Sequence, residues 1–326
     1  MQRRLLVFGL TAGLPGLTAF SRAAQAQPAS WPDRPLRIVV PFPPGGAIDA
    51  MTRLLAPRLS DSLGQSVVVE NRAGAGGTIG TGVAAQSTDG HTLLMVSIAH
   101  AVNPALYPRL PYDSAADFGA VAPVAVVPNL LVVPADRPWR TQADLVAAAR
   151  RRPGELTYAS AGSGTSIHLA GALFCAMAGI EMSHVPYRGS GPSVADLVAG
   201  RVDAMFDSVT SAAPHIASGR LRALAVTTGR RIAAFPDLPT VAEAGVPGYA
   251  VDPWFAMLAP RSLPAEARGR VGGVVGRALQ DPAVRERFAA IGAEPMEGDA
   301  ASLGRLVADE TVKWGDLVRR LGIQPD

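Results

Sequence analysis

The sequence predicts an α/β protein built as two lobes around a cleft. Short apolar runs typical of strands alternate with runs typical of helices over most of the 326 residues. This alternation indicates mostly parallel sheets with right-handed crossovers and flanking helices. The pattern restarts after Pro134, and the apolar runs 129–133 and 254–259 flank the second block. We interpret these two runs as strands that cross between the lobes, an arrangement that suits closure about a hinge.

The first block reads as a βαβαβ unit. A strand at 36–40 precedes a glycine-rich loop and an amphipathic helix at 47–63. Strands at 66–70 and 92–96 follow, with a short helix at 80–86 between them. Ligands of such sheets bind beyond the carboxyl ends of the strands. The glycine-rich loop lies at such an end, so a binding site is expected there.

The second block opens with a helix at 141–151, for which Thr141 is the expected N-cap. Its other expected elements are strands at 156–160, 183–187, 203–207 and 222–227 and helices at 165–179, 192–200 and 211–219. Helices after Pro264 are expected to return to the first lobe. The predicted boundaries are 27–130 and 252–326 for lobe 1, and 131–251 for lobe 2.

The N-terminus reads as a secretory signal peptide at residues 1–26. Arg3 and Arg4 precede a mostly apolar stretch, and Ala24-Gln25-Ala26 is a small-x-small cleavage site. The mature chain is therefore expected to begin at Gln27 in the periplasm, with Sec and twin-arginine export both open. The alternative is a membrane anchor, but the stretch falls short of the roughly 20 residues that a span needs.

Composition excludes a nucleic-acid binder. The chain has 30 Lys and Arg against 27 Asp and Glu, and three of the arginines (Arg3, Arg4 and Arg22) belong to the signal peptide. The remaining chain is close to neutral, without the clustered basic charge that nucleic acids require. Cys175 is the one cysteine, which excludes an internal disulfide and favours a small core residue.

Two glycine-rich loops carry the functional prediction. Residues 40–46 and 159–165 each follow a strand-type run and open a helix-type run, and neither contains Lys or Arg. Such junctions present unpaired N–H groups with a helix dipole behind them. Two neutral anion cradles on an exported chain indicate capture of a small carboxylate.

Several motifs in order resemble one family. They are LRIVVPFPPGGAID at 36–49, ENRAGAGGTIGTG at 70–82, PYD and DF at 111–118, YASAGSGTSIHL at 158–169, HVPYRG at 184–189 and DLPTVAEAGVPG at 237–248. They are similar to motifs of Bug-type solute-binding proteins, the extracytoplasmic receptors of tripartite tricarboxylate transporters. The resemblance implies a type II periplasmic-binding-protein fold and a carboxylated ligand in the interlobe cleft. One ligand carboxylate is then held by the two loops, while the other end varies.

The residues and the resemblance together nominate a set of ligand-binding residues. They are Phe42, Pro43, Gly45, Gly46, Asp49, Ser97, His100, Ser160, Gly162, Ser163, Gly164, Thr165, His168 and Asp207. Structural alternatives stay open for several: Asp49 as a helix cap or loop support, His100 as a surface residue, His168 as loop support and Asp207 as a structural acid. Arg188 could supply a cation for a second carboxylate, but a solvent-facing residue at the rim of the lobe is the preferred interpretation.

Enzyme functions have little support in the sequence. Ser163, His168 and Asp207 can be drawn as a hydrolase triad, but the G-x-S-x-G elbow is missing. The histidines lack metal-ligand spacing, and no cofactor is expected. The expected partners are a small carboxylate and the membrane subunits of a tripartite transporter, with the receptor as a monomer. A periplasmic sensor of the same ligand is the alternative function.

Overall fold

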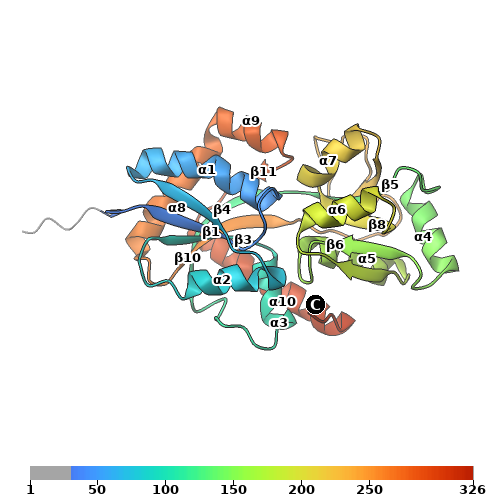
Figure 1. Cartoon of the computed structure of the whole chain (residues 1–326), viewed down its shortest axis with the longest axis horizontal. Helices are drawn as coiled ribbons and strands as arrows, with labels where there is room; N and C mark the ends of the chain where they lie inside the picture. Colours follow the sequence, from blue (N-terminus) through green and yellow to red (C-terminus); the bar gives the residue numbers. More distant parts are fainter. Residues whose placement is uncertain (1–30, 326) are drawn as a thin grey trace, which may run out of the picture. The chain divides into compact units, whose positions relative to one another are not determined.

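Two β-sheets organise the chain, and helices pack on both (Figure 1). The structure, a computed structural model, describes residues 31–325, so the predicted signal peptide lies outside the described residues. The fold below belongs to the compact unit that begins at Pro32. Within residues 31–325, every helix is too short or too polar to cross a bilayer.

The first sheet has six strands in the order β11-β4-β10-β3-β1-β2. They are β1 (Leu36–Val40), β2 (Val67–Asn71), β3 (Thr92–Ser97), β4 (Phe118–Val126), β10 (Trp254–Pro260) and β11 (Glu294–Pro295). β1 pairs in parallel with β2 and β3, whereas β10 runs antiparallel to β3 and β4. β1 to β4 therefore run in one direction and end at the same edge.

The second sheet has five strands in the order β7-β6-β8-β5-β9. They are β5 (Asn129–Pro134), β6 (Thr157–Ser160), β7 (Ser183–Pro186), β8 (Ala204–Ser208) and β9 (Leu221–Val226). β6 pairs in parallel with β7 and β8, whereas β5 runs antiparallel to β8 and β9. Four strands of each sheet thus run in one direction, as the predicted crossovers require, while β5, β10 and β11 run opposite to them.

The chain passes between the sheets twice, from β4 to β5 and from β9 to β10. The two runs predicted as crossing strands, β5 and β10, each pair within one sheet, and the passage lies immediately before them. A strand that enters a sheet from the other sheet starts at the edge where its neighbours end. This geometry explains why β5 and β10 are antiparallel to those neighbours.

Helices cover both sheets. On the first sheet they are α1 (Ala47–Leu63), α2 (Thr78–Ala85), α3 (Ala99–Leu106), α8 (Ala265–Gln280), α9 (Pro282–Ala290) and α10 (Ala300–Leu321), with a 3₁₀ turn, η1 (Ala75–Gly77). On the second they are α4 (Gln142–Arg151), α5 (Ser166–Ala178), α6 (Ser190–Val198) and α7 (Val209–Ala217). Thr141 caps α4 as predicted, because its Oγ1 accepts a hydrogen bond from the Asp144 N–H.

Three of the differences from the sequence-based expectation involve proline. β4 and α3 are not among the predicted elements, and they contain Pro123 and Pro104, a residue type that is unfavourable inside central strands and helices. Pro123 is tolerated in β4 beside a register shift against β10. α6 begins two residues before the predicted 192–200, so Pro192 is its third residue, where the missing N–H costs no intrahelical bond.

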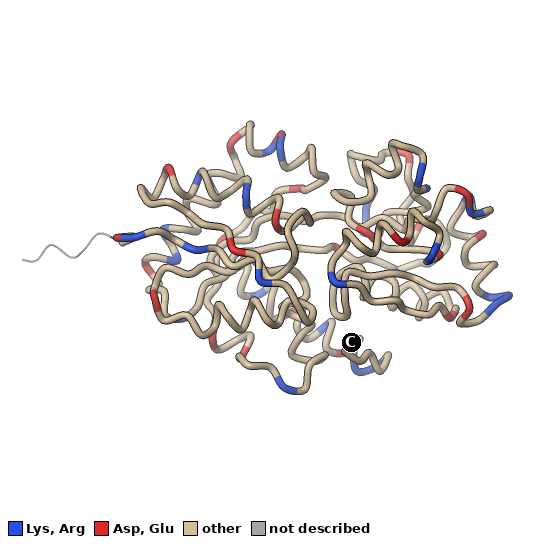
Figure 2. The backbone as a smooth tube through the Cα atoms, in the orientation of Figure 1, with Lys and Arg blue, Asp and Glu red and all other residues tan. Residues whose placement is uncertain are grey.

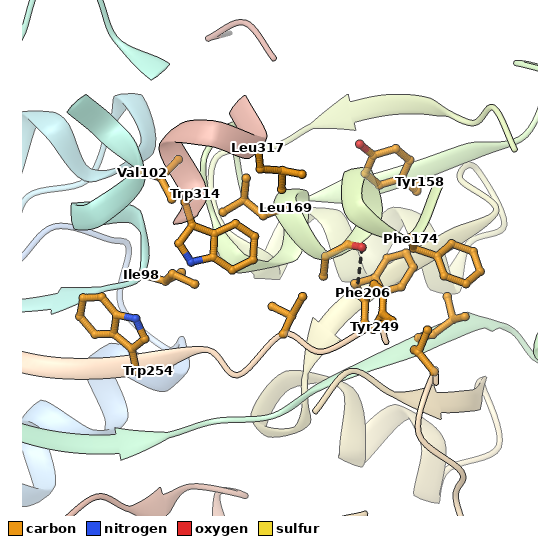
Figure 3. Packing of buried hydrophobic residues seen from close by; sticks show 14 of the residues in the cluster. Ile98, Val102, Tyr158, Leu169, Phe174, Phe206, Tyr249, Trp254, Trp314 and Leu317 are labelled. Atoms are coloured by element: carbon orange, nitrogen blue, oxygen red, sulfur yellow. Dashed lines mark hydrogen bonds between the residues drawn. The ribbon is translucent and has the colours of Figure 1, made fainter. Parts of the chain in front are cut away.

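A continuous apolar core runs under both sheets. In the second lobe Phe174 of α5 lies 5.3 Å from Phe206 and 6.4 Å from Tyr249, measured between ring centroids. The Tyr249 hydroxyl donates to the Ala170 carbonyl oxygen (Figure 3). Trp314 of α10 belongs to the same cluster (Figure 3), so the last helix contributes to a core that is shared by the two sheets.

We predict that Phe174→Ala lowers the free energy of unfolding by about 3–5 kcal/mol, because it leaves a cavity in a fully buried aromatic cluster. Urea unfolding followed by circular dichroism measures this loss. The control is Met177→Ala on the same helix, where the side chain is 40% exposed and a change below about 0.5 kcal/mol is expected. Equal losses for the two variants would contradict the prediction.

Candidate functional site

A cavity of about 300 Å³, here called the cleft, lies where strands of both sheets end. Its walls are residues 42–48 after β1, Ser97 of β3, residues 165–167 at the start of α5, residues 188–192 around the start of α6, and Ser208 and Ser211 at the start of α7. Asn129 and Phe255, at the starts of β5 and β10, complete it. The cleft therefore forms at the seam where the chain passes between sheets.

The first turns of four helices border the cleft. Residues 46–48 begin α1, residues 165–167 begin α5, residues 190–192 begin α6, and Ser208 is the N-cap of α7. N–H groups in the first turn of a helix have no intrahelical partner, and the helix dipole adds partial positive charge. Four such ends around one cavity create an environment that favours an anion.

The first glycine loop is held in place by Asp49. Asp49 Oδ2 accepts a hydrogen bond from the Gly45 N–H at 3.0 Å, and Oδ1 accepts from Asn71 Nδ2 at 2.9 Å. Arg53 Nε donates to the same carboxylate. Asp49 is buried outside the lining of the cleft, so it orients the loop, which was the structural alternative for this residue.

The charge of Asp49 is stable near neutral pH. Burial raises the pKa of the carboxyl group, but hydrogen bonds from Arg53, Gly45 and Asn71 outweigh burial and hold the pKa below its ordinary value. Gly45 adopts φ +89°, a conformation that glycine reaches without strain, and this turns its N–H toward Asp49.

The second glycine loop is braced from within. The Gly162 N–H donates to Ser160 Oγ, and the Gly164 N–H donates to His168 Nδ1 at 3.2 Å. Thr165 caps α5, because its Oγ1 accepts from the His168 N–H. The N–H groups of Gly162 and Gly164 therefore form hydrogen bonds that hold the loop in shape. The donors that face the cleft lie further along, in the first turn of α5.

Two stacked imidazoles support this loop. The rings of His168 and His184 lie 3.8 Å apart and are inclined by 4°, with Tyr158 stacked beside them. His184 Nε2 is 2.6 Å from Ser160 Oγ. Since Ser160 Oγ accepts from Gly162, its own proton is available to His184 Nε2. His168 thus supports the loop, as the structural alternative has it.

The structure separates the predicted site residues into groups. Those on the cleft are Phe42, Pro43, Gly45, Gly46, Ser97 and Thr165. Gly162 lines an adjoining cavity of about 710 Å³, which shares Phe42 and Pro43 with the cleft. Those that lie behind the cleft lining are Asp49, Ser160, Ser163, Gly164, His168 and Asp207. Contact of any of them with a ligand stays a prediction.

His100 requires a correction, because the structure places it in a different cavity. It lies on α3 and borders a separate pocket with Tyr107, Phe118 and Arg268, and it is absent from the lining of the cleft. Its ring packs edge-on against Phe118, and Nε2 lies 3.2 Å from the Ser114 carbonyl oxygen. Burial lowers the pKa of His100 to about 4, so the ring is neutral. The unpredicted helix α3 turns this side chain away from the cleft.

Arg188 is the most informative residue that the sequence analysis underestimated. Lys and Arg are interspersed with Asp and Glu along the chain (Figure 2), so composition alone does not single out one arginine. Arg188 differs in position, because it borders both the cleft and the adjoining cavity. An exposed arginine therefore borders the cleft in addition to the helix ends. The position directly after β7, at a carboxyl end, is the sequence signal that points to this role.

The hydrolase triad is incompatible with the hydrogen bonds in the second loop. A catalytic histidine donates its Nδ1 proton to an acid, whereas His168 Nδ1 accepts from the Gly164 N–H. Asp207 Oδ2 instead accepts from Ser211. Among residues 31–325, no cluster of His, Cys, Asp or Glu has the composition of a metal site.

A cleft between two α/β lobes, lined by helix N-termini, is typical of proteins that bind a small solute. The chain belongs to the family described as "Tripartite tricarboxylate transporter family receptor", which matches residues 51–323. It is 40% identical to protein BugT of Bordetella pertussis over 99% of this chain and 98% of that protein. The resemblance to Bug-type receptors is thereby confirmed.

Solved structures agree with this assignment and with the type II fold. The structure of R. palustris Rpa4515 with adipate has a TM-score of 0.87 and 40% identity, over 91% of this chain and 100% of that chain. MatC from Rhodopseudomonas palustris with bound malate has a TM-score of 0.83 and 32% identity, over 88% of this chain and 100% of that chain. The family and these neighbours are solute-binding receptors, not enzymes, and so is this chain.

We predict that Asp49→Asn lowers the free energy of unfolding by about 1–2 kcal/mol, because a hydrogen-bonded charge is replaced by an amide. The pKa of Asp49 is lowered on folding, so its contribution is fully present above the unfolded value of 3.8. The difference between variant and native protein should be constant from pH 5 to 8 and shrink below pH 4. Urea unfolding at several pH values measures it.

The control is Asp316→Asn, which removes an ion pair with Arg319 between two exposed side chains. It should change stability by less than about 0.5 kcal/mol. A loss as large as that of Asp49→Asn, or a difference for Asp49→Asn that grows toward low pH, would be evidence against Asp49 as the loop support.

Proposed function

We propose that this chain is a periplasmic receptor that captures a small carboxylate in the cleft. The observation that carries the proposal is the meeting of the first turns of α1, α5, α6 and α7 around one cavity. Carboxylate oxygens accept hydrogen bonds from the N–H groups and hydroxyls found there, and exclusion of water strengthens those bonds. The adipate and malate in the two neighbouring structures are small dicarboxylates, which supports this ligand class.

The proposed site has two ends. Residues of the first loop and the start of α5, Gly46 and Thr165 among them, hold one carboxylate. Arg188 and the start of α6 face the other end of the ligand. We further propose that residues 1–26 direct export and are removed, and that the receptor delivers its ligand to membrane subunits of a tripartite tricarboxylate-type transporter, as its family description suggests.

Calorimetry on purified and refolded residues 27–326 tests the ligand class, because refolding removes any ligand carried through purification. Adipate, malate and a tricarboxylate are compared with adipamide, the neutral amide of adipate. The proposal expects at least one acid to bind while the amide does not. Binding of the amide with equal affinity, or of none of the acids, would count against a carboxylate receptor.

Delivery is tested by uptake of the bound acid into vesicles that contain the membrane subunits. Transport should depend on the added receptor and should vanish when the receptor is left out. Receptor-independent uptake at the same rate would remove the transport proposal, while leaving ligand capture intact.

We predict that Gly46→Thr weakens binding of the identified acid by about 5- to 150-fold. An added Cβ at Gly46 meets no neighbour within 4 Å, and φ is −82°, so the side chain projects into free space without backbone strain. Threonine is also accepted at an N-cap, which preserves α1. The fold-change corresponds to the roughly 1–3 kcal/mol cost of overpacking. Calorimetry measures it, and Gly269→Thr on the exposed face of α8 is the control.

We predict that ligand binding draws lobe 1 (27–130 and 252–326) and lobe 2 (131–251) together, because the chain passes between the sheets at two adjacent points. Small-angle X-ray scattering should show a smaller radius of gyration at saturating ligand. An unchanged radius at saturation would exclude hinge closure.

A further inference from the structure

One corner of the cleft consists of two hydroxyls with a buried carboxyl group behind them. Ser208 ends β8, Ser211 lies in the first turn of α7, and both border the cleft. Asp207 has no exposed surface. Ser211 Oγ donates to Asp207 Oδ2 and lies 3.0 Å from Ser208 Oγ. The three side chains therefore form a hydrogen-bond chain from the core to the cleft.

The direction of this chain depends on the charge of Asp207, because each hydroxyl has one proton. An ionised carboxylate only accepts, so Ser211 donates to it and accepts from Ser208 in turn. Ser208 then presents lone pairs to the cleft. A protonated Asp207 donates to Ser211, Ser211 donates to Ser208, and the Ser208 proton is free to point into the cleft.

The surroundings of Asp207 allow the carboxyl group to be either protonated or ionised near neutral pH. Burial raises the pKa of Asp207 to about 7, against smaller lowering effects of hydrogen bonds from Ser211, Ser208 and Ser190. Asp207 Oδ1 is buried and has no hydrogen-bond partner among residues 31–325. An ionised carboxylate with an unsatisfied oxygen is costly in a buried site, so a small change in the cleft is enough to shift its protonation.

Charged neighbours do not cause the raised pKa of Asp207. The elements packed against β8 are β5, β6, α5, α6 and α7. Their titratable groups are Tyr158 on β6, His168 and Cys175 on α5, Asp196 on α6 and His215 on α7. Within the described part of the chain, the groups that shift the pKa of Asp207 are serine hydroxyls and a backbone amide, not these side chains.

We propose that the Asp207–Ser211–Ser208 chain takes up one proton when the far end of the ligand is a second carboxylate, and stays ionised when that end is an ammonium group. The proton comes from solvent and resides on the Asp207 carboxyl group. Ser208 then donates to the ligand carboxylate, whereas with Asp207 ionised it accepts from the ammonium group. The inference rests on the proposed function, since the other carboxylate of the ligand must occupy the same cleft.

Glutarate and 4-aminobutyrate are matched probes for this corner. Both have a carboxylate on a chain of three methylene groups. They differ in the group at the far end, which is a second carboxylate in glutarate and an ammonium group in 4-aminobutyrate. Calorimetry at pH 8 in two buffers of different ionisation enthalpy counts the protons taken up on binding. The proposal expects close to one proton for glutarate and close to none for 4-aminobutyrate.

The pH dependence of affinity gives a second readout. Between pH 6.5 and 8.5 the protonated fraction of a group with a pKa of about 7 falls about twentyfold. Glutarate affinity should fall by about that factor, and 4-aminobutyrate affinity should rise about fourfold. Equal proton uptake for the two probes, or parallel pH profiles, would overturn the proposal.

Variants test whether Asp207 itself takes up the proton. Asp207→Asn should abolish proton uptake and flatten both profiles, because the amide that replaces the carboxyl group cannot be protonated in this pH range. Ser211→Ala should remove the opposite responses of the two probes while Asp207 remains. Asp203→Asn is the control. Asp203 lies just before β8, at the end of the strand remote from the cleft, and its carboxylate accepts a hydrogen bond from the Thr157 N–H. It should keep the proton uptake of the native chain.

The outcomes separate this proposal from the proposed function. Binding of carboxylates without proton uptake, or with uptake that persists in Asp207→Asn, would contradict only the proposed protonation of the Asp207–Ser211–Ser208 chain. Failure of glutarate and 4-aminobutyrate to bind, while other acids bind, defeats the assignment of this corner to the far end of such ligands. Failure of every carboxylate to bind defeats the receptor proposal itself.

Discussion

The convergence of helix N-termini on the seam between two sheets is the constraint on which the rest of the structure depends. β5 and β10 start at this seam, while β1, β3, β6 and β8 end at it. The helices that follow β1, β6, β7 and β8 are α1, α5, α6 and α7, and they begin at the cleft, so their unpaired N–H groups gather there. The anion-binding character of the cleft is thus a consequence of strand direction and of where the chain passes between sheets.

The two loops that border the cleft are stabilised by different chemistry. On the first lobe a carboxylate, Asp49, accepts hydrogen bonds from Gly45, Asn71 and Arg53. On the second lobe His168 accepts a hydrogen bond from Gly164, and His184 lies within hydrogen-bond distance of Ser160 Oγ. The N–H groups of Gly45, Gly162 and Gly164 are thus satisfied inside the protein. The loops therefore act as rigid walls, and the donors available to a ligand come from the helix starts beside them.

The family motifs made the class of protein and much of the first wall predictable. Phe42, Pro43, Gly45 and Gly46 lie in one contiguous segment, so their common position on the cleft follows from local sequence. Arg188, Ser190, Ser208 and Ser211 were less accessible to sequence reasoning. They border the cleft around the starts of α6 and α7, which each begin two residues earlier than the pattern of polar and apolar residues indicates.

The sequence by itself determined the alternation of strands and helices, the glycine loops that join them and the membership of a receptor family, because these depend on short-range propensity and contiguous motifs. Only the tertiary structure decided which of the predicted residues share the cleft. His100 was separated from Ser97 by the turn into α3, and Asp207 was placed behind Ser211 rather than in front of it. Burial and hydrogen-bond partners across distant segments set these positions, and neither is encoded in the spacing of residues along the chain.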